Sequence, residues 1–373
     1  MKDIYKKRLE KFSNEMKARN VSAVIFEDSE EKRDVSVRYF SGHPSDAILI
    51  ITADGMSTLI PWDENLAAKV ALADKTIPYT KFDRKNTKAV SEVLKGLCLD
   101  KNSVIEFSPS TSYVQFMEYS AALEELNAVC KNNSMHSFAV AMRSVKDSYE
   151  IECTKKACSI TCSITDEIEK KLIDKSIVTE SDVALFIEKR LREENCERTG
   201  FDTLAAGPER SFAIHAFPSY TNKNWGTTGL SILDYGVVYN GYTSDATITI
   251  AKGPLSSEQK KIISLVQKAS DTVREMYAPK KSLLKAHMKA QEIFAQEGRS
   301  MPHSLGHGIG LEIHEAPFVS SRANEELCFE EGNIVTLEPG LYDPELGGVR
   351  LENDILITKN GNEMLTNSRI IML

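Results

Sequence analysis

The pattern of hydrophobic and polar positions predicts short alternating helices and strands over the first 142 residues. Apolar residues in the charged stretch Ile4–Asn20 recur with the spacing of an amphipathic helix, and Val21–Phe26 (VSAVIF) is typical of a short buried strand. The same reading predicts strands at Val35–Phe40, Ala47–Thr52, Ser57–Ile60 and Val104–Phe107, and helices at Asn65–Ala73, Thr87–Leu97 and Ser112–Leu126. This part of the chain is therefore predicted to be an α/β domain, and it contains no chemical motif that we can identify.

A different pattern begins after the charged segment Arg143–Glu150, where we place a domain boundary. Residues 1–142 and 143–373 then form separate domains, which agrees with a length of 373 residues, more than one hydrophobic core usually spans. The second domain is predicted to contain long helices at Asp147–Asp174, Glu180–Asn195, Ser256–Tyr277 and Lys281–Glu297, and a strand-rich end at Gly332–Leu373. The sequence thus favours an α+β protein of two domains.

Composition narrows the class of protein. The chain is 42% hydrophobic and 27% charged, as in ordinary globular proteins, and its net charge of −8 argues against nucleic acid or an anionic membrane as a partner. It has no apolar run of membrane-spanning length, and its start lacks the apolar core of a signal peptide. An odd number of cysteines without a Cys-x-x-Cys spacing indicates reduced thiols: Cys98, Cys130, Cys153, Cys158, Cys162, Cys196 and Cys328. We therefore expect a cytoplasmic protein.

Histidines are concentrated in the segment Met301–Pro317 (MPHSLGHGIGLEIHEAP). It contains His303, His307 and His314, three of the seven histidines in the chain, and glycines surround the middle one. Imidazole changes its protonation near neutral pH and is a common metal ligand. Taken alone, the segment is equally compatible with a metal or acid–base site and with polar residues in a glycine-rich loop.

Two aspartates lie in the segment Ile232–Ile250, where two β-rich runs flank Asn240-Gly241. Asn-Gly is the preferred pair for a two-residue type I′ hairpin turn. Counting outward from that turn pairs Asp234 with Thr247, and places Asp234 and Asp245 on one face as diagonal neighbours about 7 Å apart. A bulge would move one aspartate to the other face. Because the surroundings are apolar, burying an uncompensated carboxylate there would be costly.

A second acidic pair consists of Glu338 (IVTLEPGLY) and Glu352 (GGVRLENDILIT), each after a strand-like run. Arg350 lies two positions before Glu352, on the same face of an extended chain. One arginine cannot neutralise four carboxylates, so either the four are scattered on the surface or divalent cations hold them together. Four carboxylates and one imidazole suit two cations such as Mn²⁺, Zn²⁺, Co²⁺ or Fe²⁺.

With these segments the chain resembles the M24 metallopeptidases, which have the creatinase/aminopeptidase "pita-bread" fold and include methionine aminopeptidase, aminopeptidase P and prolidase. The strings LDYG, GYTSDAT, HSLGHGIGLEIHEAP, TLEPGLY and GVRLEND match the five metal-ligand motifs of that family in order. The gaps between the paired carboxylates resemble the Xaa-Pro peptidase branch. The resemblance implies an α+β protein with a C-terminal pita-bread domain over residues 143–373 and a smaller α/β creatinase-like N-terminal domain over residues 1–142.

The resemblance also implies roles for individual residues. Five ligands would hold two divalent ions per subunit, with Mn²⁺ favoured and Zn²⁺, Co²⁺ or Fe²⁺ as alternatives: Asp234, Asp245, His307, Glu338 and Glu352. Glu338 would accept the proton of the attacking water. His215 and His314 would be catalytic, binding the substrate and stabilising the tetrahedral intermediate or passing a proton to the leaving nitrogen. His303 would contact the substrate, with a structural or supporting role as the alternative. Arg350 would support the bridging ligands and meet a substrate carboxylate, with simple pairing to Glu352 or Asp354 as the alternative.

One segment departs from the family. Where the family commonly has Gly-x-x-Ser-Ala-x-Pro-His, this chain reads GPERSFAIHAFPS, with Ile214 in place of the proline before His215. The resemblance implies a dinuclear-metal-dependent exopeptidase, active as a homodimer, that hydrolyses Xaa-Pro bonds at peptide N-termini or in dipeptides. The altered segment keeps open a metal-dependent hydrolase or lyase of this fold that acts on a small non-peptide substrate. A catalytically inactive binding module is the third possibility, and the five intact ligands argue against it.

Overall fold

The computed structural model describes residues 2–97 and 99–373, which form two compact units. The N-terminal unit extends to Met142, and the C-terminal unit is Arg143–Leu373. Helices begin at side chains that cap the first free backbone N–H groups. Asp147, Thr179 and Ser256 each form a capping box at the start of a helix of the C-terminal unit.

The N-terminal unit is built on a six-stranded mixed sheet with the order β4-β3-β2-β1-β5-β6. Its strands are β1 (Ala23–Asp28), β2 (Ala47–Thr52), β3 (Ser57–Pro61), β4 (Lys75–Thr76), β5 (Val104–Phe107) and β6 (Asn127–Cys130). Its helices are α1 (Lys2–Ala18), α2 (Ser36–Ser41), α3 (Glu64–Val70), the 3₁₀ turn η1 (Tyr79–Phe82), α4 (Asn86–Lys95) and α5 (Tyr113–Ala122), and α6 (Met135–Ser144) follows.

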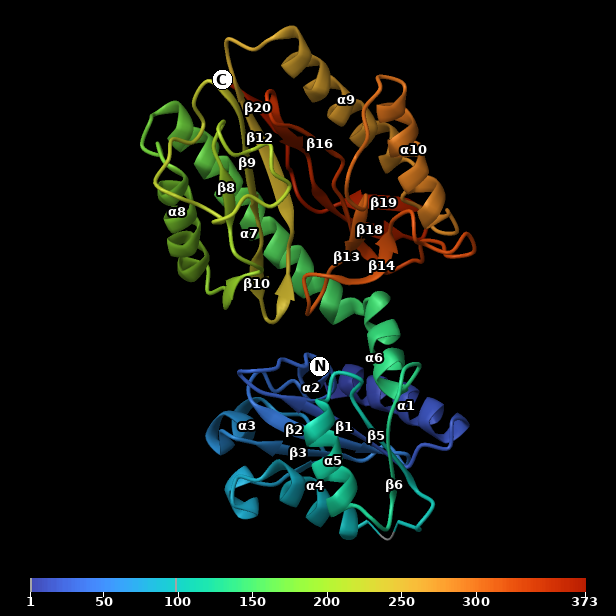
Figure 1. Ribbon diagram of the computed structural model, residues 1–373. Helices are drawn as coiled ribbons and strands as arrows, with labels where there is room; N and C mark the ends of the chain where they lie inside the picture. Colours follow the sequence, from blue (N-terminus) through green and yellow to red (C-terminus); the bar gives the residue numbers. More distant parts are fainter. Residues whose placement is uncertain (1, 98) are drawn as a thin grey trace. The chain divides into compact units, whose positions relative to one another are not determined.

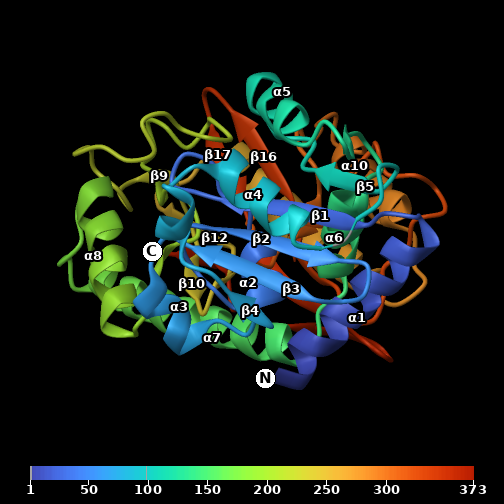
Figure 2. The same ribbon diagram turned by 90° about the horizontal axis from the view of Figure 1, so that it is seen from below.

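Helices cover both faces of this sheet, α4 and α5 on one and α1 and α2 on the other (Figures 1 and 2). Alternate residues of β1 point to opposite faces. Ile25 packs into the apolar cluster that contains Tyr119 of α5, whereas Phe26 contacts Phe12 of α1, with ring centroids 5.8 Å apart. Two cores separated by one sheet explain why β1 and β2 read as almost continuous apolar runs.

The prediction of a strand at Val35–Phe40 is wrong, because Ser36–Ser41 is the short helix α2. The backbone N–H of Ser36 donates to Asp34 Oδ1 at 3.0 Å, and the helix ends at Gly42, whose φ of 72° suits a glycine C-cap. Phe40 packs between aromatic rings, 4.7 Å from that of Phe12. Packing around both faces of so short a segment outweighs its β-rich composition.

The C-terminal unit contains two larger sheets, each covered by a pair of helices (Figure 1). The first sheet has the order β20-β12-β9-β8 and is covered by α7 and α8; the second has the order β14-β13-β15-β18-β19 and is covered by α9 and α10. The helices are α7 (Ser148–Ile173), α8 (Glu180–Glu193), α9 (Ser257–Arg274) and α10 (Leu283–Ala295).

The strands of this unit are mostly antiparallel and short. They are β7 (Arg198–Thr199), β8 (Leu204–Ala206), β9 (Gly229–Tyr235), β10 (Val237–Tyr239), β11 (Tyr242–Thr243), β12 (Ala246–Lys252), β13 (Gly306–Gly308), β14 (Glu315–Val319), β15 (Ile334–Leu337), β16 (Gly340–Asp343), β17 (Gly347–Arg350), β18 (Asn353–Thr358), β19 (Gly361–Met364) and β20 (Ile370–Met372). Two separate cores result. Ile164 of α7 packs with Ile248 of β12, and Val266 of α9 packs with Val335 of β15. The polar site described below lies on strands of both sheets.

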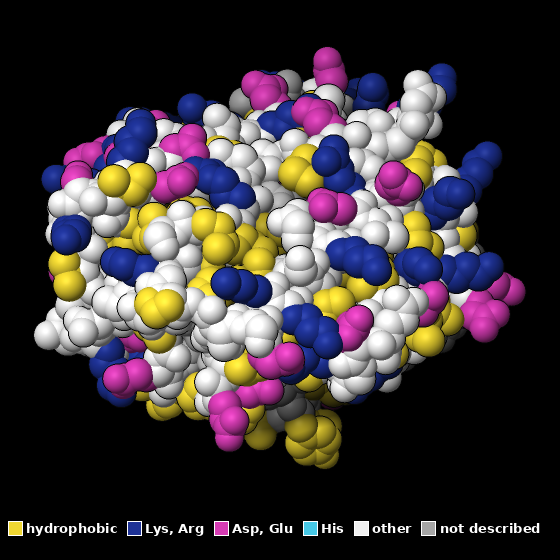
Figure 3. Space-filling model, turned by 90° about the horizontal axis from the view of Figure 1, so that it is seen from above, with side chains coloured by type: hydrophobic (Ala, Val, Ile, Leu, Met, Phe, Trp, Pro, Cys, Tyr) yellow, Lys and Arg dark blue, Asp and Glu magenta, His cyan; other side chains and the backbone are white. Residues whose placement is uncertain are grey.

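The surface charges and the cysteines do not indicate a functional site. No helix in the described ranges is long and apolar enough to cross a bilayer. On the face drawn in Figure 3, basic and acidic side chains are interspersed rather than separated by sign. The six cysteines that the structure describes form no disulfide, and Cys98 lies outside the described residues.

Candidate active site

Asp234 and Asp245 lie on the two strands of a hairpin whose turn is Asn240-Gly241. Both turn residues have positive φ, 49° and 89°, as a type I′ turn requires. The pairing keeps the same offset from the turn outward, and Asp234 lies opposite Thr247. The predicted register is therefore confirmed, and the two aspartates belong to one face of the β9–β12 ribbon.

Glu338 and Glu352 lie at the ends of neighbouring strands of the second sheet. Leu337 of β15 pairs with Asn353 of β18, which sets the two glutamates beside each other. The backbone N–H of Glu352 donates to the carbonyl of Thr247 at 3.1 Å, and the Thr247 hydroxyl donates to the Glu352 carboxylate at 2.6 Å. Thr247 follows the first acidic pair on β12, so this contact joins the two sheets at the site.

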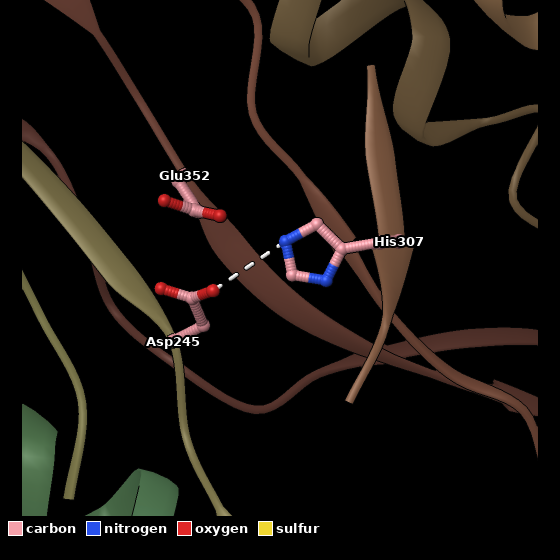
Figure 4. A group of neighbouring side chains, drawn as sticks. All are labelled: Asp245, His307 and Glu352. Carbon is pink, nitrogen blue, oxygen red and sulfur yellow. Dashed lines mark ion pairs between the residues drawn. The ribbon is translucent and has the colours of Figure 1, made fainter. Parts of the chain in front are cut away.

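His307, on β13, faces the carboxylates from a third strand (Figure 4). Its Nε2 lies 3.6 Å from an oxygen of Asp245 and 3.6 Å from an oxygen of Glu338. Its Nδ1 lies 3.1 Å from the carbonyl of Gly308, which assigns the ring proton to Nδ1 and leaves the Nε2 lone pair facing the acids. Asp245, His307 and Glu352 are buried, and each offers a ligand atom within 4.8 Å of the other two.

The electrostatics of the cluster favour a cation. Burial raises the pKa of Asp245 well above its usual range, and the nearby Glu352 and Asp234 carboxylates raise it further. Burial likewise raises the pKa of Glu352, as does the neighbouring Glu338. Burial raises the pKa of Glu338 to about 8, a shift that Arg350 opposes. Burial lowers the pKa of His307 to about 4, so its ring is neutral and able to ligate a metal.

Two buried oxygens of the cluster lack a hydrogen-bond partner among the described residues. They are Asp234 Oδ1 and Asp245 Oδ1. Buried carboxylate oxygens are normally paired or bound to a metal. Oxygen donors with one imidazole are also the donor set of hard and borderline divalent cations. The residues present therefore fit a divalent metal site.

Arg350, 2% exposed, supports the acidic residues from the side of β17. Its guanidinium donates to Asp234 Oδ2 at 2.6 Å, and its charge also interacts with that of Glu352. It also donates to the hydroxyls of Thr247 and Tyr342, at 2.9 and 2.8 Å, and to the carbonyl of Ile214 at 3.1 Å. The fork geometry of arginine allows all these bonds at once. A contact between Arg350 and a substrate carboxylate stays a prediction.

The remaining histidines gather around the metal-ligand candidates. His303 Nε2 lies 3.1 Å from the Tyr342 hydroxyl and its Nδ1 lies 2.8 Å from the carbonyl of Ser304. The His314 ring is 4.4 Å from that of His307, edge to face. Burial lowers the pKa of His303 to about 4 and also lowers that of His314, and the charge of His215 acts in the same direction on both. The structure thus brings His215 close to both rings, despite the altered segment that carries it.

These side chains line a single cavity of ≈ 480 Å³, a size within the usual range for small-ligand sites. All nine residues singled out from the sequence are in its lining: His215, Asp234, Asp245, His303, His307, His314, Glu338, Arg350 and Glu352. Aromatic and aliphatic side chains complete the wall, among them Phe201, Ile214, Phe217 and Phe318. The cavity therefore combines an acidic, histidine-rich floor with apolar walls.

Three supporting residues were missed at the level of the sequence. Thr247 and Tyr342 bind Arg350, and Asp354 Oδ2 accepts from the backbone N–H of Asp245 at 2.9 Å. Thr247 could have been found, since the predicted register places it opposite Asp234. Tyr342 and Asp354 act through contacts between separate strands, which periodicity does not reveal.

Comparisons with known proteins agree with this arrangement. The model of metallopeptidase family M24 matches residues 152–359, and the Creatinase/Prolidase N-terminal domain matches residues 8–145. The chain belongs to metallopeptidase family M24. It is 31% identical over 98% of both chains to a Xaa-Pro dipeptidase of Pyrococcus horikoshii. Two solved structures are also similar. The Xaa-Pro dipeptidase from Bacillus anthracis is 25% identical (TM-score 0.86, 99% and 100% coverage), and the X-Pro aminopeptidase from Thermotoga maritima is 26% identical (TM-score 0.81, 95% and 98% coverage).

The expected family and fold class are thereby confirmed: this M24 chain has a creatinase-type N-terminal domain and a C-terminal catalytic domain of mixed helices and sheets. Membership of the family makes it a metallo-exopeptidase that uses divalent metal. Its Asp245, His307 and Glu352 form the buried group best suited to bind that metal.

Proposed function

We propose that this M24 protein hydrolyses Xaa-Pro bonds, in dipeptides or at the N-terminus of short peptides, with two divalent metal ions. The observation that carries the proposal is the convergence of Asp234, Asp245, His307, Glu338 and Glu352 on one cavity of peptide size. The similarity to proteins named Xaa-Pro dipeptidase along almost the whole chain supports the substrate class. We take Mn²⁺ as the first candidate and Zn²⁺, Co²⁺ or Fe²⁺ as alternatives, because oxygen-rich sites with one imidazole suit all of them.

In this proposal the cluster of four carboxylates and His307 holds the metal, and repulsion among the carboxylates is relieved when a cation binds. Two bound cations would supply Lewis-acid chemistry, which would polarise the scissile carbonyl and lower the pKa of the attacking water towards neutrality. Glu338, at the cavity wall, accepts the proton of that water.

The remaining histidines of the cavity act on the peptide itself in this proposal. His314 and His215 donate to the carbonyl oxygen as it becomes negatively charged, or protonate the leaving proline nitrogen. His303 is held by Tyr342 and Ser304 in one ring orientation, which suits a residue that positions the substrate. The apolar walls around Phe201 and Phe318 suit a proline ring and an apolar side chain.

A small non-peptide substrate remains the second candidate, and the specific reason is Ile214, which replaces the proline expected before His215. The side chain of Ile214 lines the cavity. A different residue beside His215 in the cavity lining would change the shape of the substrate that the cavity accepts. A homodimer and a cytoplasmic location stay predictions.

The test is to remove metal with a chelator, add back Mn²⁺, Zn²⁺ or Co²⁺ separately, and assay Ala-Pro, Ala-Pro-Ala and Ala-Ala. We expect metal to restore cleavage of Ala-Pro and Ala-Pro-Ala but not of Ala-Ala. The ratio of the Ala-Pro rate to the Ala-Pro-Ala rate then shows whether the protein acts mainly as a dipeptidase or as an aminopeptidase. Glu338→Gln should abolish the activity, whereas Glu345→Gln on the exposed β16–β17 turn should not. Bound metal without cleavage of either proline peptide would favour the non-peptide substrate.

A further inference from the structure

Glu180, the first residue of α8, is a fully buried carboxylate outside the catalytic cavity. Its Oε1 accepts from the backbone N–H of Gly207 at 2.8 Å. Its Oε2 accepts from Arg210 Nη1 at 2.9 Å, and from the backbone N–H and the hydroxyl of Thr221 at 2.7 and 2.6 Å. All these donors belong to one segment, Gly207–Thr221, which we call the His215 loop.

The four bonds close both ends of that loop. Gly207 begins it and Thr221 ends it, so a single carboxylate ties together positions fourteen residues apart. Arg210 adds a second tie, because its guanidinium donates to the carbonyl of Pro218 as well as to Glu180. Gly207 cannot be replaced without movement, since a Cβ there would lie 2.1 Å from the carbonyl oxygen of Asn224.

The middle of the loop is held by the catalytic unit. The Ser211 hydroxyl donates to the carbonyl of Leu230 at 2.7 Å and accepts from the N–H of Gly348 at 3.1 Å. At the tip, Arg350 donates to the carbonyl of Ile214. His215 follows directly and is exposed at the cavity, and no hydrogen bond to its ring is found within residues 2–97 and 99–373. Its position is therefore set by the backbone of the loop.

A buried carboxylate is costly unless its partners compensate it. Among the described residues, the hydrogen bonds to the Glu180 carboxylate all come from this loop, which ties the stability of the charge to the closed loop. We propose that Glu180 is a positioning residue that holds the His215 loop closed and thereby places His215 for the proposed peptide hydrolysis. The expected effect on peptide hydrolysis rests on the proposed function, whereas the expected effect on the position of His215 does not.

The first test uses the imidazole NMR signals of the full-length, metal-free protein. Seven histidines give few signals, and His215→Asn assigns the one of interest. We expect Glu180→Gln to shift or broaden the His215 signal and to leave those of His43 and His287 unchanged. The matched control is Glu167→Gln, which removes an equivalent pairing with Arg190 between α7 and α8, at 2.9 Å, and should leave the His215 signal in place.

If Glu180→Gln does not fold, Thr221→Val takes its place, because it removes one bond to the carboxylate with little change of shape. It should move the His215 signal in the same direction. An unchanged His215 signal in the folded variant would overturn the proposal.

The second test is a double-mutant cycle with Ala-Pro on the Mn²⁺-loaded protein. Glu180→Gln should lower kcat/KM by about tenfold to hundredfold, the scale of a small misplacement of a reacting group, and have less than about a twofold effect in the His215→Asn background. If the losses of kcat/KM caused by Glu180→Gln and His215→Asn multiply in the double variant, Glu180 acts independently of His215 and the proposal is wrong. If the unmodified protein cleaves no proline peptide, the proposed function fails, and the NMR experiment still decides the role of Glu180.

Discussion

Arg350 donates a hydrogen bond of 2.6 Å to Asp234, although the two residues are 116 positions apart in the chain. Both are buried, and the guanidinium also binds Thr247, Tyr342 and the carbonyl of Ile214. This one side chain therefore connects a metal-ligand candidate on β9, the two-stranded β16–β17 sheet and the loop that carries His215.

Arg350→Lys should impair both stability and activity, because an ammonium cannot reach all of these acceptors. We expect a loss of about 3 kcal/mol in the free energy of unfolding, typical for a broken buried pair, measured by urea denaturation, and a fall in kcat/KM. Arg369→Lys is the control, since Arg369 pairs with Asp166 and Glu169 where the side chains are one-third to one-half exposed. Equal losses of unfolding free energy and of kcat/KM in the two variants would contradict the role of Arg350 in holding the site together.

Asp245→Asn should separate the binding of metal from folding. The carboxylate is buried among other carboxylates, so an amide relieves repulsion in the metal-free protein. We expect the metal-free variant to unfold at the same temperature as the unmodified protein or higher, and to lose the rise in Tm that Mn²⁺ produces. Asp271→Asn, on the exposed face of α9, should keep that rise. A variant that Mn²⁺ stabilises as much as the unmodified protein would count against Asp245 as a ligand.

Glu315→Gln tests a buried ion pair next to His314. Glu315 lies 3.1 Å from Arg143 Nε and 3.1 Å from Lys146 Nζ. Burial would raise the pKa of Glu315, but Lys146 and Arg143 outweigh it, so the pKa lies below its ordinary value of 4.5. Protons therefore bind the unfolded chain more tightly. The ionised group contributes stability above about pH 4.5, and that stability is lost as the pH falls through the lower folded pKa.

The expected cost of Glu315→Gln is about 3 kcal/mol at pH 7, and it should shrink as the pH falls below 4.5. Unfolding of the C-terminal unit is followed by the fluorescence of Trp225 in a Trp62→Phe background. Glu363→Gln, which breaks a half-exposed pair with Lys155, should cost less than about 1 kcal/mol at every pH. A cost of Glu315→Gln that does not change with pH would show that its charge is not what stabilises the fold.

Phe217 is 95% exposed and lines the cavity, which makes it a candidate contact for the residue before proline. Phe217→Ser should lower kcat/KM for Leu-Pro and Phe-Pro by about fivefold to thirtyfold relative to Gly-Pro, the effect of losing one apolar contact. Tm should not change, since the side chain has little packing to lose. Phe212→Ser is the matched control, because Phe212 is 43% exposed in the same loop and does not line the cavity. Identical ratios in both variants would remove Phe217 from the substrate site.

Local chemistry made part of this site predictable from the sequence. Asn240-Gly241 fixes a turn type, the turn fixes a register, and the register places Asp234 and Asp245 on one face. The wrong strand at Val35–Phe40 shows the opposite case: six residues carry too little local preference to outweigh packing on both faces.

Contacts between segments far apart in the sequence could not be predicted, because they depend on how the elements pack and not on local preference. Arg350 was placed at the site, but its partner Asp234 follows from the meeting of two sheets. From the sequence, Glu180 was only the first residue of the predicted helix Glu180–Asn195. Its burial against the His215 loop depends on how α8 packs.

The most direct measurement is anomalous X-ray diffraction at the manganese edge from crystals of the full-length protein soaked in Mn²⁺. The account predicts two anomalous peaks, about 3.5–4 Å apart as in other two-metal sites, bound by Asp234, Asp245, His307, Glu338 and Glu352. Peaks held by other residues, or none at saturating Mn²⁺, would contradict it.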